Sequence, residues 1–596
     1  MKLGNRTIKK INNDCQKENN RWKFGGGNEK LLIATIMVLS FLFHIVVLNQ
    51  LNCWFSTDTD GYWLHAASFA GYRWGDVAKN MGAFYSWGYS VLLTIPMMLS
   101  KDPVVRYKIA VLINVVLCTL LVPIVYRFSK KVAPDVARVF HLFIALVVSC
   151  YSTYILESAV SLAETTIYFL SILIIYLLYT YFETHKLWIG VLCGFAMGYL
   201  YIVHNRCIGM LIAYVIVVMI YGIKRRKWKE LIALLLPVVL MFVLKEGVQE
   251  WLKGIENTDG VYTSNTYGAM ATKASRLTFY GILSMIKNAL GEVWYTLIGT
   301  LMIAGFGLME IITNRLPKRQ EGTGDDTGFL YLYGILSWIF MIGISSFFFM
   351  RSKAVLSARM DAIIYGRYME PTLGLFLIMG LIYLVRDHVK NKKEIGLIIG
   401  ATALLSILIA GFEAETEASG VNWFSIVAIL MPFSYGKQIP SVIESSIVLG
   451  AVGLFVLYIF NMRGKGYKLF SLILITGTFL FVGYNATSTI STIYAEIASV
   501  ENDPLYNDDF LAISNYLEER EIENVCVMAD RGYDAFSYQF LMPDVKVVSI
   551  SDETELEEID GNDMVILSGS TIITQSYTVL YEGQSAKLVE INGYEQ

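Results

Sequence analysis

Acidic and basic side chains recur where long apolar segments of this sequence end. Asp58 and Asp60 come directly after an apolar run, and Glu164 stands at the head of another. Arg206 opens a later run, and Arg367 lies just before one. Charges at a membrane boundary are costly unless they have a partner or a task. Carboxylates opposite guanidinium groups suit a base for an acceptor hydroxyl or amine, and a clamp for an anionic leaving group.

Further charges crowd the segment before residue 371, where Arg351, Lys353, Arg359, Asp361 and Glu370 accompany Arg367. Structural explanations stay open for every member of the candidate set. The two aspartates could cap the helix that follows them. Glu164 could pair with a neighbouring helix, Arg206 could snorkel to the interface, and Arg367 could pair with Glu370 or Asp361. The prediction of a functional site therefore depends on all these residues lying at the same membrane face, and not on any single residue.

The composition is that of a polytopic membrane protein. Of the 596 residues, 55% are hydrophobic and 17% are charged, with a mean hydropathy of +0.50. Runs of about 20 apolar residues are long enough to cross a bilayer. Thirteen windows are predicted to do so: 31–51, 107–126, 136–156, 159–182, 187–203, 206–222, 230–245, 293–312, 328–349, 371–386, 395–411, 442–461 and 468–484.

The basic residues between these windows orient the chain. With residues 1–30 as a cytoplasmic tail, every second connection lies inside, and nearly all of those short connections are basic, as the positive-inside rule requires. These connections include Lys130, Lys131, residues 224–227, Arg315, Lys392 and Lys465. An odd number of spans then puts the candidate charges and the C-terminal segment outside, in a multi-pass protein of the plasma membrane.

The membrane domain is predicted at 31–484. One region within it and one region after it do not have the pattern of membrane spans. The first outer loop, 52–106, is long and aromatic. Its stretch at 84–99 is too short to cross and predicts an interfacial helix, with Tyr85, Trp87 and Tyr89 at headgroup level. Residues 61–72 predict a short amphipathic helix. Residues 485–596 alternate short apolar strands, at 524–529, 545–550 and 564–567, with helical stretches at 509–520 and 534–541, which predicts a small outer α/β domain.

Other chemistries find little support. The seven cysteines have no regular spacing and are expected to act as small apolar residues, without disulfides or a zinc site. The basic residues are not clustered as a nucleic-acid footprint would be. No metal cluster is expected, although a divalent ion bridging Asp58 and a phosphate stays open, and no cofactor is otherwise implied.

Taken in order, these motifs resemble the polytopic glycosyltransferases of the GT-C class, which include protein O-mannosyltransferases and aminoarabinose transferases of lipid A. The motifs are Asp58-x-x-x-Tyr62-x-x-x-Ala66, the stretch 88–96, Glu164, Arg206 and Gly366-Arg367-Tyr368-x-x-Pro371. The resemblance implies that Asp58 is the catalytic base. Many relatives have adjacent acidic residues there, so Asp60 stays a second catalytic candidate. The matching motifs also make Tyr62, Glu164, Arg206, Arg367 and Tyr368 candidates for substrate binding. Arg351 and Lys353 join them because a departing phosphate needs cations that stabilise its developing charge.

The expected activity is therefore an inverting glycosyl transfer at the outer membrane face. Nucleotide sugars are confined to the cytoplasm, so the donor there is expected to be a sugar linked to polyprenyl phosphate, and the acceptor a glycan, lipid or protein of the cell envelope. Two other classes stay open. A flippase for lipid-linked sugars would carry polar residues through the bilayer midplane. An O-antigen-type polymerase or ligase would use a large late outer loop, which here is 412–441 and contains one basic residue, Lys437.

Overall fold

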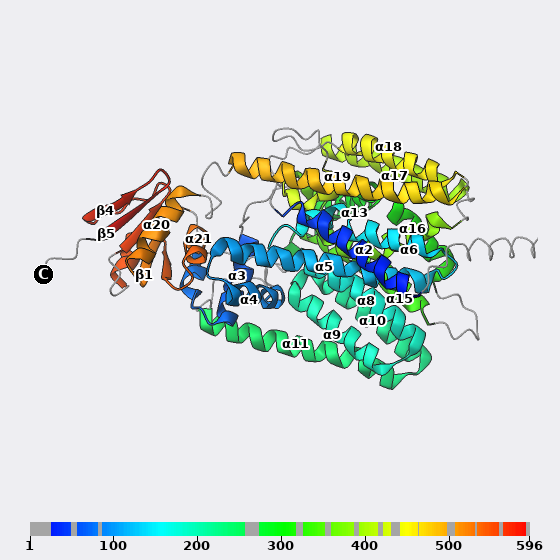
Figure 1. The fold of residues 1–596 in the computed structure, drawn as a ribbon, viewed down its shortest axis with the longest axis horizontal. Helices are drawn as coiled ribbons and strands as arrows, with labels where there is room; N and C mark the ends of the chain where they lie inside the picture. Colours follow the sequence, from blue (N-terminus) through cyan, green and yellow to red (C-terminus); the bar gives the residue numbers. More distant parts are fainter. Residues whose placement is uncertain are drawn as a thin grey trace, which may run out of the picture.

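The computed structural model describes residues 26–48, 57–80, 86–256, 273–316, 326–351, 359–386, 392–414, 421–430, 442–462, 464–497, 507–530, 533–558 and 564–591. Within them, long apolar helices form a bundle, and the C-terminal residues form a sheet at one end of it (Figure 1). The bundle helices are α2 (Gly26–Ile45), α5 (Pro103–Val132), α6 (Arg138–Ser149), α7 (Ser152–Glu157), α8 (Glu164–Thr184), α9 (Leu187–Val203), α10 (Ile208–Arg225), α11 (Trp228–Glu256), α13 (Phe279–Gly299), α14 (Ile303–Glu310), α15 (Gly328–Phe348), α16 (Glu370–Val385), α17 (Lys392–Ala414), α18 (Val442–Phe460) and α19 (Lys465–Ile497).

The helical membrane fold predicted from the sequence is confirmed. In the described residues, nine helices are long and apolar enough to cross a bilayer, or eleven if each of two bent pairs counts as one span. The two remaining predicted windows, 136–156 and 187–203, fall on the shorter apolar helices α6 and α9.

Two predicted spans are not straight. The window 293–312 contains a bend of 104° between α13 and α14. Leu301 and Met302, between the two helices, both have left-handed backbone angles (φ of 53° and 65°), which a continuous helix cannot accommodate. The window 136–156 is likewise divided, because α6 ends at Ser149 and α7 begins at Ser152. Hydropathy does not detect such breaks.

Small residues bring α14 and α16 into close contact. A Cβ added at Gly307 would lie 1.9 Å from the Phe376 carbonyl oxygen, and one at Gly380 would lie 2.0 Å from that of Ile303. Backbone approach through small residues is a common way to pack helices inside a membrane, where little hydrophobic driving force exists between them.

The C-terminal domain contains the predicted strands and two more. Its sheet has the order β2-β1-β3-β5-β4, in which β1 pairs in parallel with β2 and β3, while β5 is antiparallel to β3 and β4. The strands are β1 (Asn524–Ala529), β2 (Lys546–Ile550), β3 (Met564–Ser568), β4 (Tyr577–Glu582) and β5 (Ala586–Ile591), accompanied by α20 (Asp508–Glu519) and α21 (Tyr533–Leu541). The parallel strands are buried, as expected for the centre of an α/β sheet.

The first outer loop folds into α3 (Thr57–Ala70), η1 (Gly75–Asn80) and α4 (Gly88–Leu99). The segment between α3 and η1 and the first turn of α5 attach the C-terminal domain to the bundle. Trp74 Nε1 donates to the Pro543 carbonyl oxygen at 3.1 Å, and the Arg106 guanidinium donates to the carbonyl oxygen of Phe540 at 3.0 Å and covers its ring.

The predicted headgroup position of the α4 aromatics is wrong for Trp87 and Tyr89. Both side chains are buried, Trp87 donates to the carbonyl oxygen of Lys245, and Tyr89 bonds to Asn114. Tyr85 lies outside the described residues. The amphipathic pattern cannot distinguish lipid from protein as the neighbour of an aromatic side chain, and here the neighbour is protein.

Ion pairs define the two ends of the bundle. Lys101, just before α5, pairs with Asp544 of the C-terminal domain at 2.7 Å. Lys131, near the other end of α5, pairs with Glu183 at the end of α8. A 30-residue helix is about 45 Å long, so these pairs lie on opposite sides of a hydrocarbon layer of about 30 Å. Glu164, at the start of α8, therefore lies at the end that holds the C-terminal domain.

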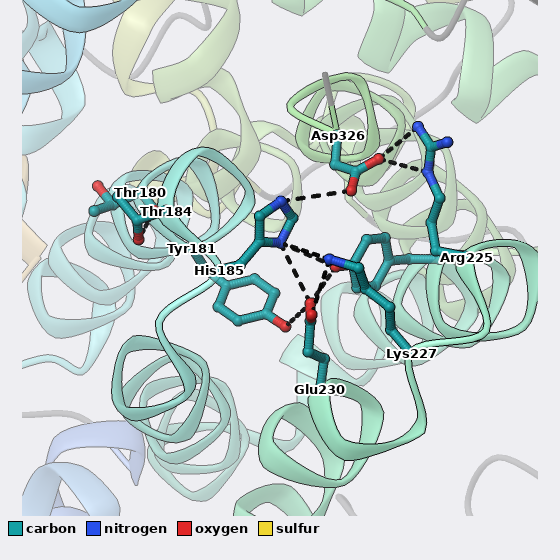
Figure 2. A network of polar contacts seen from close by, with 9 residues as sticks. Thr180, Tyr181, Thr184, His185, Arg225, Lys227, Glu230 and Asp326 are labelled. Atoms are coloured by element: carbon teal, nitrogen blue, oxygen red, sulfur yellow. Dashed lines mark hydrogen bonds and ion pairs between the residues drawn. The ribbon is translucent and has the colours of Figure 1, made fainter. Parts of the chain in front are cut away.

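The remote end carries a dense polar network that joins α8, α10, α11 and α15 (Figure 2). Glu230 accepts a hydrogen bond from Tyr181 at 2.7 Å and lies 3.3 Å from His185 Nδ1. Asp326 pairs with Arg225 at 2.6 Å and lies 3.7 Å from His185 Nε2. His185 thus connects two carboxylates and fixes the turn between α8 and α9 at the end where the predicted inner loops gather.

Candidate active site

Four charged side chains meet at the bundle end next to the C-terminal domain. Arg367 NH1 lies 3.2 Å from Asp58 Oδ2, and Arg367 Nε donates to Glu164 Oε1 at 2.5 Å. Arg206 NH2 donates to the same Glu164 oxygen at 2.8 Å. The order along the chain of contacts is Asp58, Arg367, Glu164, Arg206. Residues separated by up to 309 positions in the sequence thus form one continuous ionic cluster.

Each member sits where a helix begins or is interrupted. Asp58 is in the first turn of α3, and Glu164 is the first residue of α8. Carboxylates at these positions interact favourably with the positive end of the helix dipole. Arg206 lies in the 3₁₀ turn η2 (Asn205–Cys207) before α10, where His204 Nδ1 accepts the Arg206 backbone N–H at 3.1 Å.

Arg367 lies in a second 3₁₀ turn, η5 (Gly366–Tyr368), immediately before α16. This turn meets the following helix at an angle of 73°. A Cβ added at Gly366 would lie 2.3 Å from the Tyr295 ring, so only glycine fits there. Tyr295 in turn donates to Glu370, which also accepts from Thr153 at 2.6 Å. Buried polar contacts therefore hold the Arg367 backbone in place.

Burial divides the cluster into an inner and an outer part. The side chains of Glu164, Arg206 and Arg367 are 1%, 4% and 8% exposed, whereas that of Asp58 is 30% exposed. Two guanidinium groups share the Glu164 carboxylate, so Glu164 alone does not neutralise them. Asp58 and the adjoining edge of Arg367 are the part of the cluster that an incoming molecule can reach.

Several polar atoms of this buried region have no hydrogen-bond partner among the described residues: both Glu157 carboxylate oxygens, Glu164 Oε2 and Arg206 Nε. Buried polar groups are normally satisfied, and exceptions often mark functional sites. Glu157 is fully buried and belongs to the same connection as Glu164. The predicted site did not include Glu157, although the sequence places this acid seven residues before Glu164, across the same connection.

Asp60 is separated from Asp58. Two positions on a helix differ by about 200° in direction, and the Asp60 side chain is buried where Asp58 is partly exposed. Its Oδ1 accepts from Thr59 Oγ1 at 3.2 Å. Burial, with a smaller contribution from the nearby Asp58 charge, raises the pKa of Asp60 well above its ordinary value. The two candidate bases therefore occupy different environments.

Tyr62 lies beside the cluster and not in its chain of ion pairs. Its ring packs edge-on against Tyr89, with centroids 5.3 Å apart. Tyr89 bonds to Asn114, whose amide donates to the Val160 carbonyl oxygen at 2.7 Å. Through these contacts α3 supports the connection that leads to Glu164.

Tyr368 and Arg351 extend the site on its other side. Arg206 lies over the Tyr368 ring at 5.6 Å, and Tyr365 packs against Tyr368. Beyond these rings, Arg351 donates to the Arg359 carbonyl oxygen at 2.7 Å, and Arg359 pairs with Asp361. Within the part of the chain that the structure describes, Arg351 makes no hydrogen bond or ion pair with Glu164 or Asp58. Lys353 lies outside the described residues.

No group of three or more histidine, cysteine, aspartate or glutamate side chains lies together as a metal-binding set in the described ranges. Asp58 and Glu164 each already contact Arg367. The ionic cluster itself consists of carboxylates and guanidinium groups.

Comparison with known proteins identifies the fold. The structures of ArnT from Cupriavidus metallidurans, bound to undecaprenyl phosphate and in the apo state, match this chain with a TM-score of 0.51 and 12% identity. The matches cover 95% and 94% of this chain and 98% and 97% of ArnT. The oligosaccharyltransferase AglB from Archaeoglobus fulgidus, in complex with an inhibitory peptide and a dolichol phosphate, matches at 9% identity and a TM-score of 0.38, over 90% of this chain and 69% of AglB. No family model and no curated protein sequence matches. The chain has a GT-C-like fold, as its sequence motifs predicted.

Proposed function

We propose that this protein is a membrane glycosyltransferase that moves a sugar from a polyprenyl-phosphate donor to an acceptor in the cell envelope. The observation that carries the proposal is the ionic chain from Asp58 through Arg367 and Glu164 to Arg206. It combines one accessible carboxylate with guanidinium groups that a buried partner holds in place. The GT-C-like fold supports a lipid phosphate as the leaving group, because the similar protein ArnT was solved bound to undecaprenyl phosphate.

Asp58 is the general base of the proposed reaction. Its carboxylate accepts the proton of an acceptor O–H or N–H as the acceptor atom bonds to the anomeric carbon of the donor. The bond from that carbon to the phosphate oxygen breaks, and its electron pair stays on the phosphate. Attack from the side opposite the phosphate inverts the anomeric configuration. The pair with Arg367 orients Asp58 for this step.

Arg367 stabilises the phosphate as its charge develops. A preorganised guanidinium aimed at a developing anion lowers the barrier because it need not reorganise during the reaction. Glu164 and the turn at Gly366 hold Arg367 in one conformation. Arg206 also donates to Glu164. The Glu164 carboxylate therefore neutralises less of the Arg367 charge, and more of that charge is available to the phosphate. Glu164 and Arg206 are thus positioning residues, and Tyr62 and Tyr368 line the substrate region.

The proposed location of this site is the extracytoplasmic face of the plasma membrane. The basic connections of the sequence lie at the bundle end remote from the site, where the pairs of Lys131 and Arg225 are found. A lipid-linked donor reaches an outer site by lateral diffusion, whereas a nucleotide sugar would not be present there.

The test is transfer by purified protein. Wild-type enzyme with a polyprenyl-phosphate sugar and an envelope extract as acceptor should release polyprenyl phosphate, and the Asp58→Asn variant should not. Mass spectrometry of envelope glycans and glycoproteins from cells with and without the gene identifies the sugar and the acceptor. Transport of intact lipid-linked sugar across vesicles without any transfer would contradict the proposal.

A further inference from the structure

A pocket lined by several basic side chains lies at the bundle end remote from the proposed active site. It has a volume of about 630 Å³ and is enclosed by the start of α2, the last turns of α5 and Tyr176 of α8. Pockets that bind small ligands typically measure roughly 300–1,000 Å³. The pocket is therefore large enough for a lipid headgroup rather than for a few water molecules.

Cations dominate the walls of this pocket. Lys30, Arg127, Lys130 and Lys131 face a single lining carboxylate, Glu29. Lys130 pairs with Glu29 at 2.6 Å, and Lys131 pairs with Glu183. Lys30 and Arg127 have no acidic or hydrogen-bonding partner among the described residues. The pocket thus presents two uncompensated positive charges.

Interaction with the helix dipole does not explain why a lysine stands at position 30. A lysine near the C-terminus of a helix interacts favourably with the helix dipole, which accounts for Lys130 and Lys131 at the end of α5. Lys30 lies instead near the N-terminus of α2, where the dipole disfavours a cation. Lys30 is exposed and lines the pocket with Arg127, so both cations are accessible to an anion there.

The position of the pocket at the ends of membrane helices indicates which kind of anion it binds. α2 and α5 lie side by side (Figure 1), and both pass the composition test for membrane spans. The cations lie at the ends of these spans, where lipid phosphates lie, and Ile33 and Tyr176 add apolar surface toward the hydrocarbon. Basic pockets between membrane helices commonly hold the headgroups of anionic lipids.

We propose that this pocket binds the phosphate headgroup of an anionic phospholipid, with Lys30 and Arg127 as its ligands. The lipid would tie the α2 terminus to α5 on the membrane face opposite the active site. This binding is independent of glycosyl transfer, so its test does not rely on the proposed reaction.

The experiment uses full-length protein in nanodiscs of phosphatidylcholine with increasing phosphatidylglycerol. We expect a saturable rise in thermal unfolding temperature, and bound phosphatidylglycerol in native mass spectra. Lys30→Gln combined with Arg127→Gln should weaken the apparent affinity at least about tenfold, because two charge-assisted hydrogen bonds are removed. Lys30→Arg, which keeps the charge, should retain binding.

The control variant combines Lys186→Gln with Lys224→Gln. It removes the same charge from exposed positions at the same bundle end, outside the pocket, and should bind phosphatidylglycerol like the wild type. Equal weakening in the control, or undiminished binding by the pocket variant, would overturn the proposal. Equal stabilisation by soluble glycerol phosphate or by phosphatidylcholine alone would also overturn it, because the site would then not select an anionic lipid.

Discussion

Replacing Asp58 by asparagine tests the core of the proposed mechanism. The asparagine side chain is nearly isosteric with aspartate but cannot accept the acceptor proton. Removal of a general base costs about 10²- to 10⁴-fold in rate, which corresponds to about 3–5 kcal/mol of activation free energy. We expect transfer by Asp58→Asn to fall by this amount.

The structure indicates that the loss of activity in Asp58→Asn will not result from unfolding of the protein. Asp58 pairs with Arg367 at 3.2 Å, and its side chain is 30% exposed. Solvent screening limits such a pair to about 1 kcal/mol or less of stability. Arg367 keeps its contacts with Glu164 in the variant, so no guanidinium is left buried without a partner. The catalytic effect therefore exceeds the structural effect several-fold.

The assay measures release of polyprenyl phosphate by purified variants at saturating donor, with the thermal unfolding temperature recorded for each. Asp60→Asn is the matched control, since it makes the same chemical change two residues away in a buried environment. Asp58→Glu, which keeps a carboxylate but moves it by about 1.5 Å, should retain part of the activity. Full turnover by Asp58→Asn, or loss of activity only in Asp60→Asn, would refute the assignment of the base.

Three further predictions concern the clamp, the buried acid and the topology. Arg367→Ala and Arg206→Ala should weaken use of the donor by about ten- to a hundredfold, more for Arg367 because it also contacts Asp58, with only partial rescue by lysine; unchanged donor kinetics in both variants would place the clamp elsewhere. Because the folded-state pKa of Asp60 is raised, its contribution to stability is complete below the unfolded pKa of about 3.9 and is lost as the pH rises through the folded value. The unfolding temperature of Asp60→Asn should accordingly gain on the wild type with increasing pH, and a pH-independent difference would contradict the buried, protonated carboxyl. A reporter fused after Ile497, where α19 ends, should be extracytoplasmic and one fused after Lys227 cytoplasmic; the same location for both would overturn the topology.

The two ends of the bundle carry different polar networks. Glu230, Asp326 and His185 tie together the helices at the end where the basic connections lie (Figure 2). At the other end, the helices are interrupted at Glu164, Arg206 and Arg367. The fold thus has carboxylates joined through His185 at one end and, at the other, an ionic cluster built where helices begin or are interrupted.

Much of the architecture follows from local features of the sequence. Apolar runs of about 20 residues identify the membrane helices because lipid cannot satisfy exposed backbone groups. Short apolar strands predicted β1, β2 and β3 of the C-terminal domain at their observed positions. Charges at the ends of apolar runs singled out Asp58, Glu164, Arg206 and Arg367 as candidates.

Only the tertiary structure decided how these residues combine. Arg367 contacts Glu164 across 203 positions and Asp58 across 309, and a window of neighbouring residues has no information at such separations. Packing of α3 against the bundle buries Asp60 but leaves Asp58 accessible, and Arg351 bonds to the Arg359 carbonyl oxygen instead of joining the cluster. Hydropathy determines which segments enter the membrane, whereas the pairing of charges depends on which helix ends the packing brings together.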